Sequence, residues 1–434
     1  MNFVSTNGKS DPVSFLEAMV RGLAPDGGLF MPEQIPVLPE STLTNLSRLS
    51  FNDLAFRMAS PFLKGEIGEE ALRRVLSDAF DFPTEISEPE PGKFVLELFH
   101  GPTLAFKDYG ARFMARLFSE LAGRRGEEVT ILVATSGDTG SAVANGFFKV
   151  PGVKVFVLYP GGKVSPLQEK QFTTLGENIT ALEVEGVFDD CQKLVKQAFV
   201  DDELQKKMQL SSANSINIAR LLPQSFYYGY ASARLTSKGI EAPVFSVPSG
   251  NFGNLTGGLI AERMGIPASG FLAATNKNSV VPEFLQGEAF TPRASVQTIS
   301  NAMDVGNPSN FDRIMHLCSG DESMIRKQLR GYSCSDLETR ETIAAVYQKT
   351  GYVMCPHTAV GYRAAGEFHQ ENKDAATVTL ATAHPVKFRE VVEPVIGKTV
   401  AVPERLKPIL EKQSSSHSLP ADYAAFRDLL FSSV

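Results

Sequence analysis

The sequence contains little cysteine and histidine, and neither residue type is clustered. The four cysteines, Cys191, Cys318, Cys334 and Cys355, lie in 434 residues without a Cys-x-x-Cys pair. This scatter predicts reduced, partly buried thiols rather than disulfide bonds. The six histidines are also dispersed, without the residue spacing that is typical of zinc sites. We therefore expect no metal centre in this protein.

The sequence also lacks an excess of basic residues and any long apolar run. Its formal net charge is -7, which argues against nucleic acids and acidic membranes as partners. No apolar stretch approaches the roughly 18 residues that span a bilayer. Residues 1–12 lack the charged and apolar regions of a signal peptide. These absences predict a cytoplasmic protein without membrane contact, and no obligate protein partner is evident.

The composition is that of a globular protein large enough for two or three domains. Of the 434 residues, 43% are hydrophobic and 21% are charged, and a chain of this length exceeds one simple core. Helical patterns dominate residues 1–92, and the Pro- and Gly-containing stretch 87–92 reads as a linker. Beyond it, strand patterns alternate with helical patterns, as in parallel βαβ units. We therefore predict an α/β fold with a helical N-terminal region (1–92) and two doubly wound lobes (93–210 and 211–434).

Short apolar runs mark the predicted strands. The run from Val129 to Ala134 has the character of a strand that is buried on both faces. An aromatic-rich pattern between residues 211 and 234 predicts one long helix. Ligands of open α/β sheets bind beyond the carboxyl ends of the strands, so the loops from strand to helix are the places to search. Further strands are predicted at 94–98, 153–158, 179–184, 244–247, 271–274 and 377–380.

The stretch 99–116 contains Lys107, the first candidate for chemistry. Gly101 and Pro102 break the preceding strand, and Thr103 can cap a following helix. Apolar residues then recur at three- and four-residue spacing, which places Lys107 in the first turn of that helix. The positive end of the helix dipole favours a neutral amine, as a lysine needs in order to condense with an aldehyde. An ordinary exposed helix lysine explains this stretch equally well.

Two strand-to-helix loops carry features that bind anions. The loop 134–142 crowds hydroxyls and free N–H groups at a helix start, where a carboxylate or phosphate binds well; an ordinary N-cap is the alternative. The loop 247–254 has glycines that let successive N–H groups converge on a phosphate; a plain tight turn is the alternative. It lacks the motifs of ATP and NAD sites, which makes those ligands poor candidates. The candidate residues are Thr135, Ser136, Gly137, Asp138 and Thr139 in the first loop and Gly250, Asn251, Phe252, Gly253 and Asn254 in the second.

Two further segments complete the candidates. Thr382 follows a late strand and offers a neutral hydroxyl that can bond a ring nitrogen. For this loop the favoured alternative is an ordinary connection in which His384, before Pro385, is simply a helix-start residue. The segment 212–220 brings Asn214, Ser215 and Arg220 together at a helix start. Arginine is a natural bidentate partner of phosphate, but a solvated helix N-terminus explains this segment equally well.

A lysine that binds an aldehyde, a glycine and asparagine cradle for phosphate, and a carboxylate loop together describe a pyridoxal-phosphate site. Four motifs then carry a specific resemblance: Asp26-Gly-Gly-Leu-Phe-Met-Pro32, His100-Gly-Pro-Thr-Leu-Ala-Phe-Lys107-Asp, Thr135-Ser-Gly-Asp-Thr-Gly and Ser249-Gly-Asn-Phe-Gly-Asn254. In these motifs the sequence closely resembles the threonine synthase family. The likeness extends to Leu419-Pro-Ala-Asp-Tyr-Ala424 and thus covers nearly the whole chain.

The resemblance implies a fold-type-II pyridoxal-phosphate enzyme that converts O-phospho-L-homoserine and water to L-threonine and phosphate, the last step of threonine biosynthesis. It implies that Lys107 holds the cofactor and shuttles protons, and that Thr382 faces the pyridine nitrogen. By the same motif match, Gly250, Asn251, Phe252, Gly253 and Asn254 bind the cofactor phosphate, Ser136, Gly137, Asp138 and Thr139 line the substrate carboxylate side, and Thr135, Asn214, Ser215 and Arg220 bind the substrate phosphate.

One position departs from the wider pattern, because related fold-type-II enzymes carry asparagine where this chain has Asp138. We assign Asp138 to the cofactor, yet an ionised carboxylate there repels both a cofactor phenolate and a substrate carboxylate, so its role stays open. Two alternatives to the function also stay open. The same scaffold serves threonine dehydratases and related phospho-lyases, and a binding or regulatory protein can keep the fold without turnover.

Overall fold

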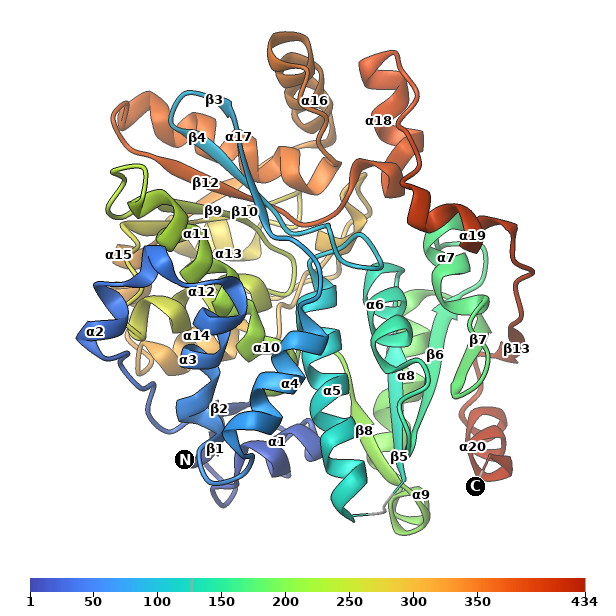
Figure 1. The fold of residues 1–434 in the computed structure, drawn as a ribbon. Coiled ribbons are helices and arrows are strands. Elements are labelled where there is room, and N and C mark those ends of the chain that lie inside the picture. Colours follow the sequence, from blue (N-terminus) through green and yellow to red (C-terminus); the bar gives the residue numbers. More distant parts are fainter. Residues whose placement is uncertain (126–127, 434) are drawn as a thin grey trace.

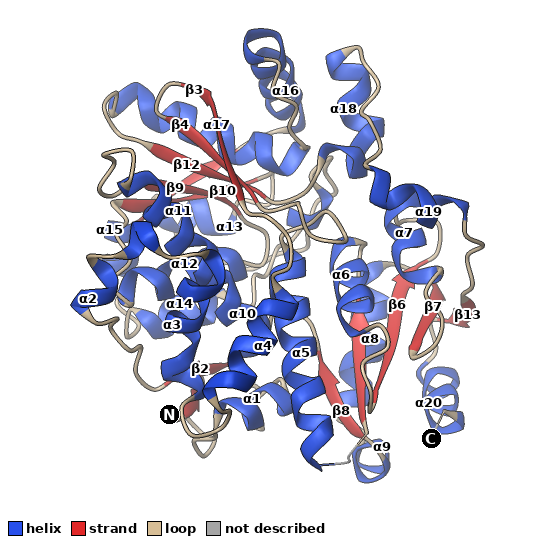
Figure 2. Cartoon of the chain, in the orientation of Figure 1, coloured by secondary structure: helices blue, strands red, loops and turns tan. Residues whose placement is uncertain are grey.

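The computed structural model describes residues 1–125 and 128–433 and contains two main β-sheets with helices packed around each (Figures 1 and 2). One sheet contains β3 (Glu85–Glu90), β4 (Lys93–Glu97), β9 (Val244–Pro248), β10 (Gly270–Thr275), β11 (Leu329–Ser333) and β12 (Thr377–Ala381). The other contains β5 (Val129–Ala134), β6 (Val153–Pro160), β7 (Ile179–Glu185), β8 (Gln209–Ser212) and β13 (His417–Pro420). A third, two-stranded sheet pairs β1 (Phe3–Ser5) with β2 (Phe30–Pro32).

The strand order is β11-β10-β9-β12-β4-β3 in the six-stranded sheet and β13-β7-β6-β5-β8 in the five-stranded sheet. Neighbouring strands of these two sheets are parallel, except that β3 pairs antiparallel with β4. Every residue of β5 and of β12 is buried, as expected for parallel strands that helices cover on both faces. The predicted α/β fold with two lobes is confirmed.

The helices surround these sheets (Figure 2), and α5 packs against both α4 and α6 near the centre of the molecule. Among the described residues, no helix has the length and apolar content that crossing a membrane requires. The N-terminal part contains α1 (Phe15–Arg21), α2 (Glu40–Leu43), η1 (Leu46–Arg48), α3 (Phe51–Leu63) and α4 (Glu69–Ala79). Then follow α5 (Lys107–Arg125), α6 (Asp138–Phe147), α7 (Pro166–Thr173), α8 (Phe188–Phe199), α9 (Asp202–Lys207), α10 (Ile218–Leu221), η2 (Leu222–Ser225), α11 (Phe226–Thr236), α12 (Gly253–Arg263) and α13 (Val280–Leu285). The last helices are η3 (Asn301–Met303), α14 (Phe311–Leu317), α15 (Glu322–Gln328), α16 (Asp336–Thr350), α17 (Pro356–Glu371), η4 (Pro385–Phe388), α18 (Arg389–Ile396), η5 (Glu404–Leu406), α19 (Lys407–Glu411) and α20 (Tyr423–Ser432).

Two local predictions were wrong. The stretch 87–92, read as a linker, lies largely in β3, an edge strand, where Pro89 is tolerated because an edge has ladder positions without a partner. The single helix predicted between 211 and 234 is instead the end of β8 followed by α10, η2 and α11. The four residues of β8 are too few to show the alternation of apolar and polar residues that marks a strand in the sequence.

Sheet membership does not follow the expected sequence ranges. β3 and β4, which bracket the boundary at residue 92, both join the six-stranded sheet with strands from beyond residue 211. In turn, β13 from the C-terminal part joins the five-stranded sheet beside β7. The chain therefore crosses between the sheets after β4, after β8 and before β13, and Lys107 lies within the first of these crossings, between β4 and β5.

Candidate active site

Lys107 is the first residue of α5, as the sequence predicted. The loop before it runs beside the segment that follows β12: Phe106 N donates to Thr382 O at 2.8 Å and His384 N donates to Leu104 O at 3.0 Å. Between these bonds, Ala105 and Ala383 form an isolated antiparallel bridge. This short pairing brings the start of α5 and Thr382 together, although they are far apart in the sequence.

The amine of Lys107 lies among several charged groups. Burial lowers the pKa of Lys107 to about 8; the carboxylate of Asp138 opposes this shift, and the charges of Arg220 and Lys387 add to it. The sequence argument expected a low pKa from the helix dipole, but desolvation is the main cause in the structure. A pKa of about 8 leaves part of the amine neutral near neutral pH, and the neutral amine is the form that condenses with an aldehyde.

Residues 250–254 form the end of a loop and the start of α12, and their backbone is free to bind a ligand. Phe252 takes a left-handed conformation with φ 60°, and α12 begins at the next residue. In the described part of the chain, none of the backbone N–H groups from Gly250 to Asn254 donates to an acceptor. Unpaired N–H groups at a helix start attract phosphate, so this loop fits the phosphate group of the expected cofactor.

The side chains of this loop have a different task, which is to hold it in place. Asn251 Nδ2 donates to Ser215 Oγ at 2.6 Å, and Asn251 Oδ1 accepts a bond from Ser309 N. Asn254 Nδ2 donates to Pro248 O at 2.8 Å. A Cβ at residue 250 would lie 2.7 Å from Met303 Cα, so glycine is needed there for the close approach of η3. The structure thus leaves only the backbone of residues 250–254 available for an anion.

The loop between β5 and α6 presents a second set of free N–H groups. Thr135 Oγ1 accepts bonds from the N–H groups of Gly137 and Gly140, at 2.9 and 2.8 Å. Gly137 has φ 139°, a conformation that favours glycine. Within the residues that the structure describes, the N–H groups of Ser136, Asp138 and Thr139 have no acceptor. Thr135 therefore shapes the loop, while the N–H groups at the start of α6 are free to hold a carboxylate.

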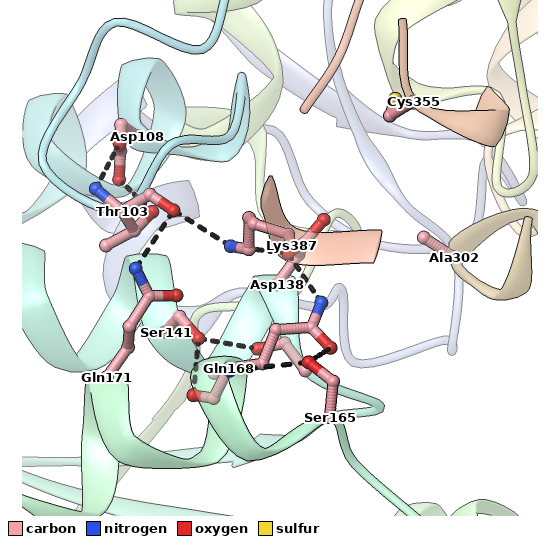
Figure 3. A network of polar contacts seen from close by, with 12 residues as sticks. Thr103, Asp108, Asp138, Ser141, Ser165, Gln168, Gln171, Ala302, Cys355 and Lys387 are labelled. Atoms are coloured by element: carbon pink, nitrogen blue, oxygen red, sulfur yellow. Dashed lines mark hydrogen bonds and ion pairs between the residues drawn. The ribbon is translucent and has the colours of Figure 1, made fainter. Parts of the chain in front are cut away.

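Asp138 is buried, and Figure 3 shows the contacts that pair it. Its Oδ1 lies 2.6 Å from Lys387 Nζ and accepts a bond from Gln168 Nε2 at 2.7 Å. Burial alone would raise the pKa of Asp138, but the nearby charges of Lys387 and Lys107 hold that pKa well below its usual range. The carboxylate is therefore ionised, and the ammonium of Lys387 compensates its charge.

Sequence reasoning missed Lys387 and His357. Lys387 lies in η4, shortly after β12, and its position just beyond the carboxyl end of a strand was the signal that could have found it. His357 is buried in α17; its Nε2 accepts a bond from Ala302 N at 3.1 Å. Burial lowers the pKa of His357 to about 4, against the opposing charge of Asp138, so this imidazole is neutral at neutral pH.

Arg220 lies buried near Lys107, on α10. One of its terminal nitrogens donates to Ala213 O, while its Nε has no partner. A Cβ at residue 110 would lie 2.9 Å from this Nε, so Gly110 makes room for the guanidinium beside α5. The neighbouring Asn214 Oδ1 is also buried without a partner. Such unpaired polar groups are costly unless a ligand binds them, which fits an anion site.

Two further candidate residues have defined environments. Thr382 is buried, and its hydroxyl makes no hydrogen bond among residues 1–125 and 128–433; it is available to a ligand, while its carbonyl holds the loop before α5. Ser215 accepts bonds from Asn251 at its hydroxyl and from Arg313 Nη1 at its carbonyl. Ser215 therefore supports the cradle, and a direct contact with a substrate phosphate stays a prediction.

Comparison with known proteins now bears on this site. The family models described as "Threonine synthase N terminus", "Pyridoxal-phosphate dependent enzyme" and "Threonine synthase, C-terminal" match residues 2–80, 90–382 and 358–430. The chain is 44% identical to the threonine synthase of Escherichia coli (strain K12) over 435 residues, which covers 99% of each chain. The chain belongs to the threonine synthase family.

Solved structures of threonine synthases agree with this assignment. The crystal structure of the Escherichia coli threonine synthase matches with a TM-score of 0.93 and covers 100% of both chains. The PLP-bound threonine synthase of Brucella melitensis also matches with a TM-score of 0.93, at 35% identity over 99% of this chain and 98% of that one. The protein is therefore a pyridoxal-phosphate-dependent lyase of fold type II, and the expectation drawn from the motifs is confirmed.

Proposed function

We propose that this protein converts O-phospho-L-homoserine and water to L-threonine and phosphate, in the cytoplasm, with pyridoxal phosphate held at Lys107. The observation that carries the proposal is the buried, incompletely paired guanidinium of Arg220 beside Lys107. One anion cradle, at residues 250–254, suits the cofactor phosphate. A second cationic site is needed only if the substrate itself carries a phosphate.

Different residues of the chain bind the cofactor, bind the substrate and move protons. The backbone of residues 250–254 binds the cofactor phosphate, and the hydroxyl of Thr382 faces the ring nitrogen. The free N–H groups at the start of α6 hold the substrate carboxylate. When bound, the cofactor withdraws electrons from the substrate α carbon. Lys107 would hold the cofactor until the substrate amine replaces it, and its Nζ would then take the α proton and a β proton so that phosphate can leave the γ carbon. The same amine would return protons to the γ and α carbons as water adds at the β carbon.

Arg220 and Asn214 orient the phosphate that leaves. Burial lowers the pKa of Arg220 to about 10, so the guanidinium is still charged at neutral pH. A buried cation at this position favours the accumulation of negative charge on the departing phosphate, because the surroundings screen it poorly. A threonine dehydratase would have no use for this residue, which makes Arg220 the residue that distinguishes the two reactions.

We expect Arg220→Gln to lower kcat/KM for O-phospho-L-homoserine by roughly 10- to 100-fold, the loss that follows from removing a charged hydrogen bond. The measurement is phosphate release, together with the inhibition constant of a phosphonate analogue of the substrate. Arg220→Lys keeps the charge and serves as the matched control, with a smaller loss. If the analogue binds Arg220→Gln as well as the wild type, the substrate does not place its phosphate at Arg220.

A further inference from the structure

The buried pair of Asp138 and Lys387 joins segments from the two sheets next to Lys107. Asp138 starts α6 beside the five-stranded sheet, and Lys387 follows β12 of the six-stranded sheet. Lys387 Nζ lies 2.6 Å from Asp138 Oδ1 and donates to Thr103 O at 2.8 Å (Figure 3). The side chain of Lys387 has no exposed surface, and that of Asp138 is 4% exposed. An ammonium placed this deeply is retained only where it has charged and polar partners.

Charged groups on three other elements act on Lys107. Asp138 on α6 attracts a proton to the Lys107 amine, while Arg220 on α10 and Lys387 on η4 repel it. His357 on α17 interacts with the charges of Asp138, Lys107 and Lys387, and it is neutral at neutral pH. Within α5 itself, the carboxyl of Asp108 is engaged by the N–H and hydroxyl groups of Thr103. Asp138 is therefore the one anion that acts strongly on Lys107 among the described residues.

We propose that Lys387 is a positioning residue: by pairing with Asp138 it prevents that carboxylate from pairing with Lys107, and so keeps the Lys107 amine free for its part in the reaction. This inference rests on the proposed role of Lys107 but not on the identity of the substrate. It also explains how an ionised Asp138 can lie near the substrate carboxylate and the cofactor phenolate: the pair of Asp138 and Lys387 carries no net charge, so it does not repel them.

The alternative is that the pair only ties the two segments together. A purely structural tie changes stability but does not change the protonation of Lys107. The proposal instead requires opposite effects from the two partners. Without Lys387, the unpaired carboxylate draws a proton to Lys107; without the carboxylate, the Lys387 charge repels that proton. Removing both groups cancels most of the two effects.

The test is a pH titration of the visible absorption band of the holoenzyme, which changes as the nitrogen of Lys107 gains or loses a proton. We expect the midpoint to rise by about one pH unit or more in Lys387→Met, to fall in Asp138→Asn, and to return close to the wild-type value in the double variant. The pH dependence of acetylation at Lys107, measured by mass spectrometry before cofactor is added, should shift in the same directions. Neither readout involves turnover, so a wrong substrate assignment leaves both unchanged.

The matched control is Lys170→Met, which removes another ammonium that bonds main-chain carbonyls, those of Leu410 and Lys412, and that is not among the charges acting on Lys107. Its midpoint should equal the wild-type value. An unchanged or lower midpoint in folded Lys387→Met overturns the proposal. If that variant does not fold, Lys387→Arg should keep the wild-type midpoint while Asp138→Asn lowers it, and the absence of a fall in Asp138→Asn overturns the proposal equally.

Discussion

Lys107→Ala is expected to reduce threonine formation from O-phospho-L-homoserine by roughly 10⁴-fold or more, because one side chain holds the cofactor and moves the proton. The position of Lys107 explains this dependence. It is the first residue of α5, its loop is bonded to the Thr382 segment, and burial lowers its pKa to about 8. In the described part of the chain, the other lysine close to this site is Lys387, which is already engaged by Asp138 and Thr103.

The measurement is phosphate and threonine release by the purified variant, with its visible absorption spectrum recorded beforehand. Wild-type protein should be yellow, and borohydride should remove the yellow colour while fixing the cofactor to the protein; neither is expected of Lys107→Ala. Lys327→Ala, which changes an exposed lysine of α15, is the control and should be fully active. Near-normal turnover in Lys107→Ala would refute the assignment of Lys107.

The sequence allowed the anchor residues of the site to be predicted because their signals are local. Lys107, the loop 134–142 and the loop 247–254 each follow a strand and open a helix, and each contains its characteristic residues within a few positions. Gly137 has φ 139°, a backbone conformation that other residues rarely adopt. Gly250 packs so closely against η3 that a side chain would not fit there. Such features can be read from one segment at a time.

The charge balance of the site could not be predicted in this way, because it depends on residues that only the fold brings together. Lys387 meets Asp138 across the two sheets, and His357 meets η3 through Ala302. Short or charged edge strands such as β3 and β8 were missed for a related reason. Their neighbours in the sheet, and not their own apolar content, stabilise them.

A second large effect is expected at Arg313, whose replacement by methionine should destabilise the protein by about 3 kcal/mol or more. Arg313 is completely buried and ties its own segment to two that are distant in the sequence. Its guanidinium donates to Phe30 O at 3.0 Å, to Ile216 O at 2.6 Å and to Asn310 Oδ1 at 2.7 Å. Methionine fills much of the same volume but leaves these buried acceptors without a donor, and each such loss costs about 1–3 kcal/mol.

The same change should weaken cofactor binding, because Arg313 also holds the carbonyl of Ser215, whose hydroxyl anchors Asn251 in the phosphate cradle. Urea unfolding followed by far-ultraviolet circular dichroism gives the stability, and a titration of cofactor absorbance gives the affinity.

Arg326→Met is the control: this half-buried arginine donates to Phe284 O and pairs with Glu322, and its loss should cost about 1 kcal/mol or less. Equal unfolding midpoints for the two variants would show that Arg313 does not hold these segments together. If Arg313→Met loses stability but binds the cofactor as tightly as the wild type, the contact between Arg313 and Ser215 does not support the phosphate cradle.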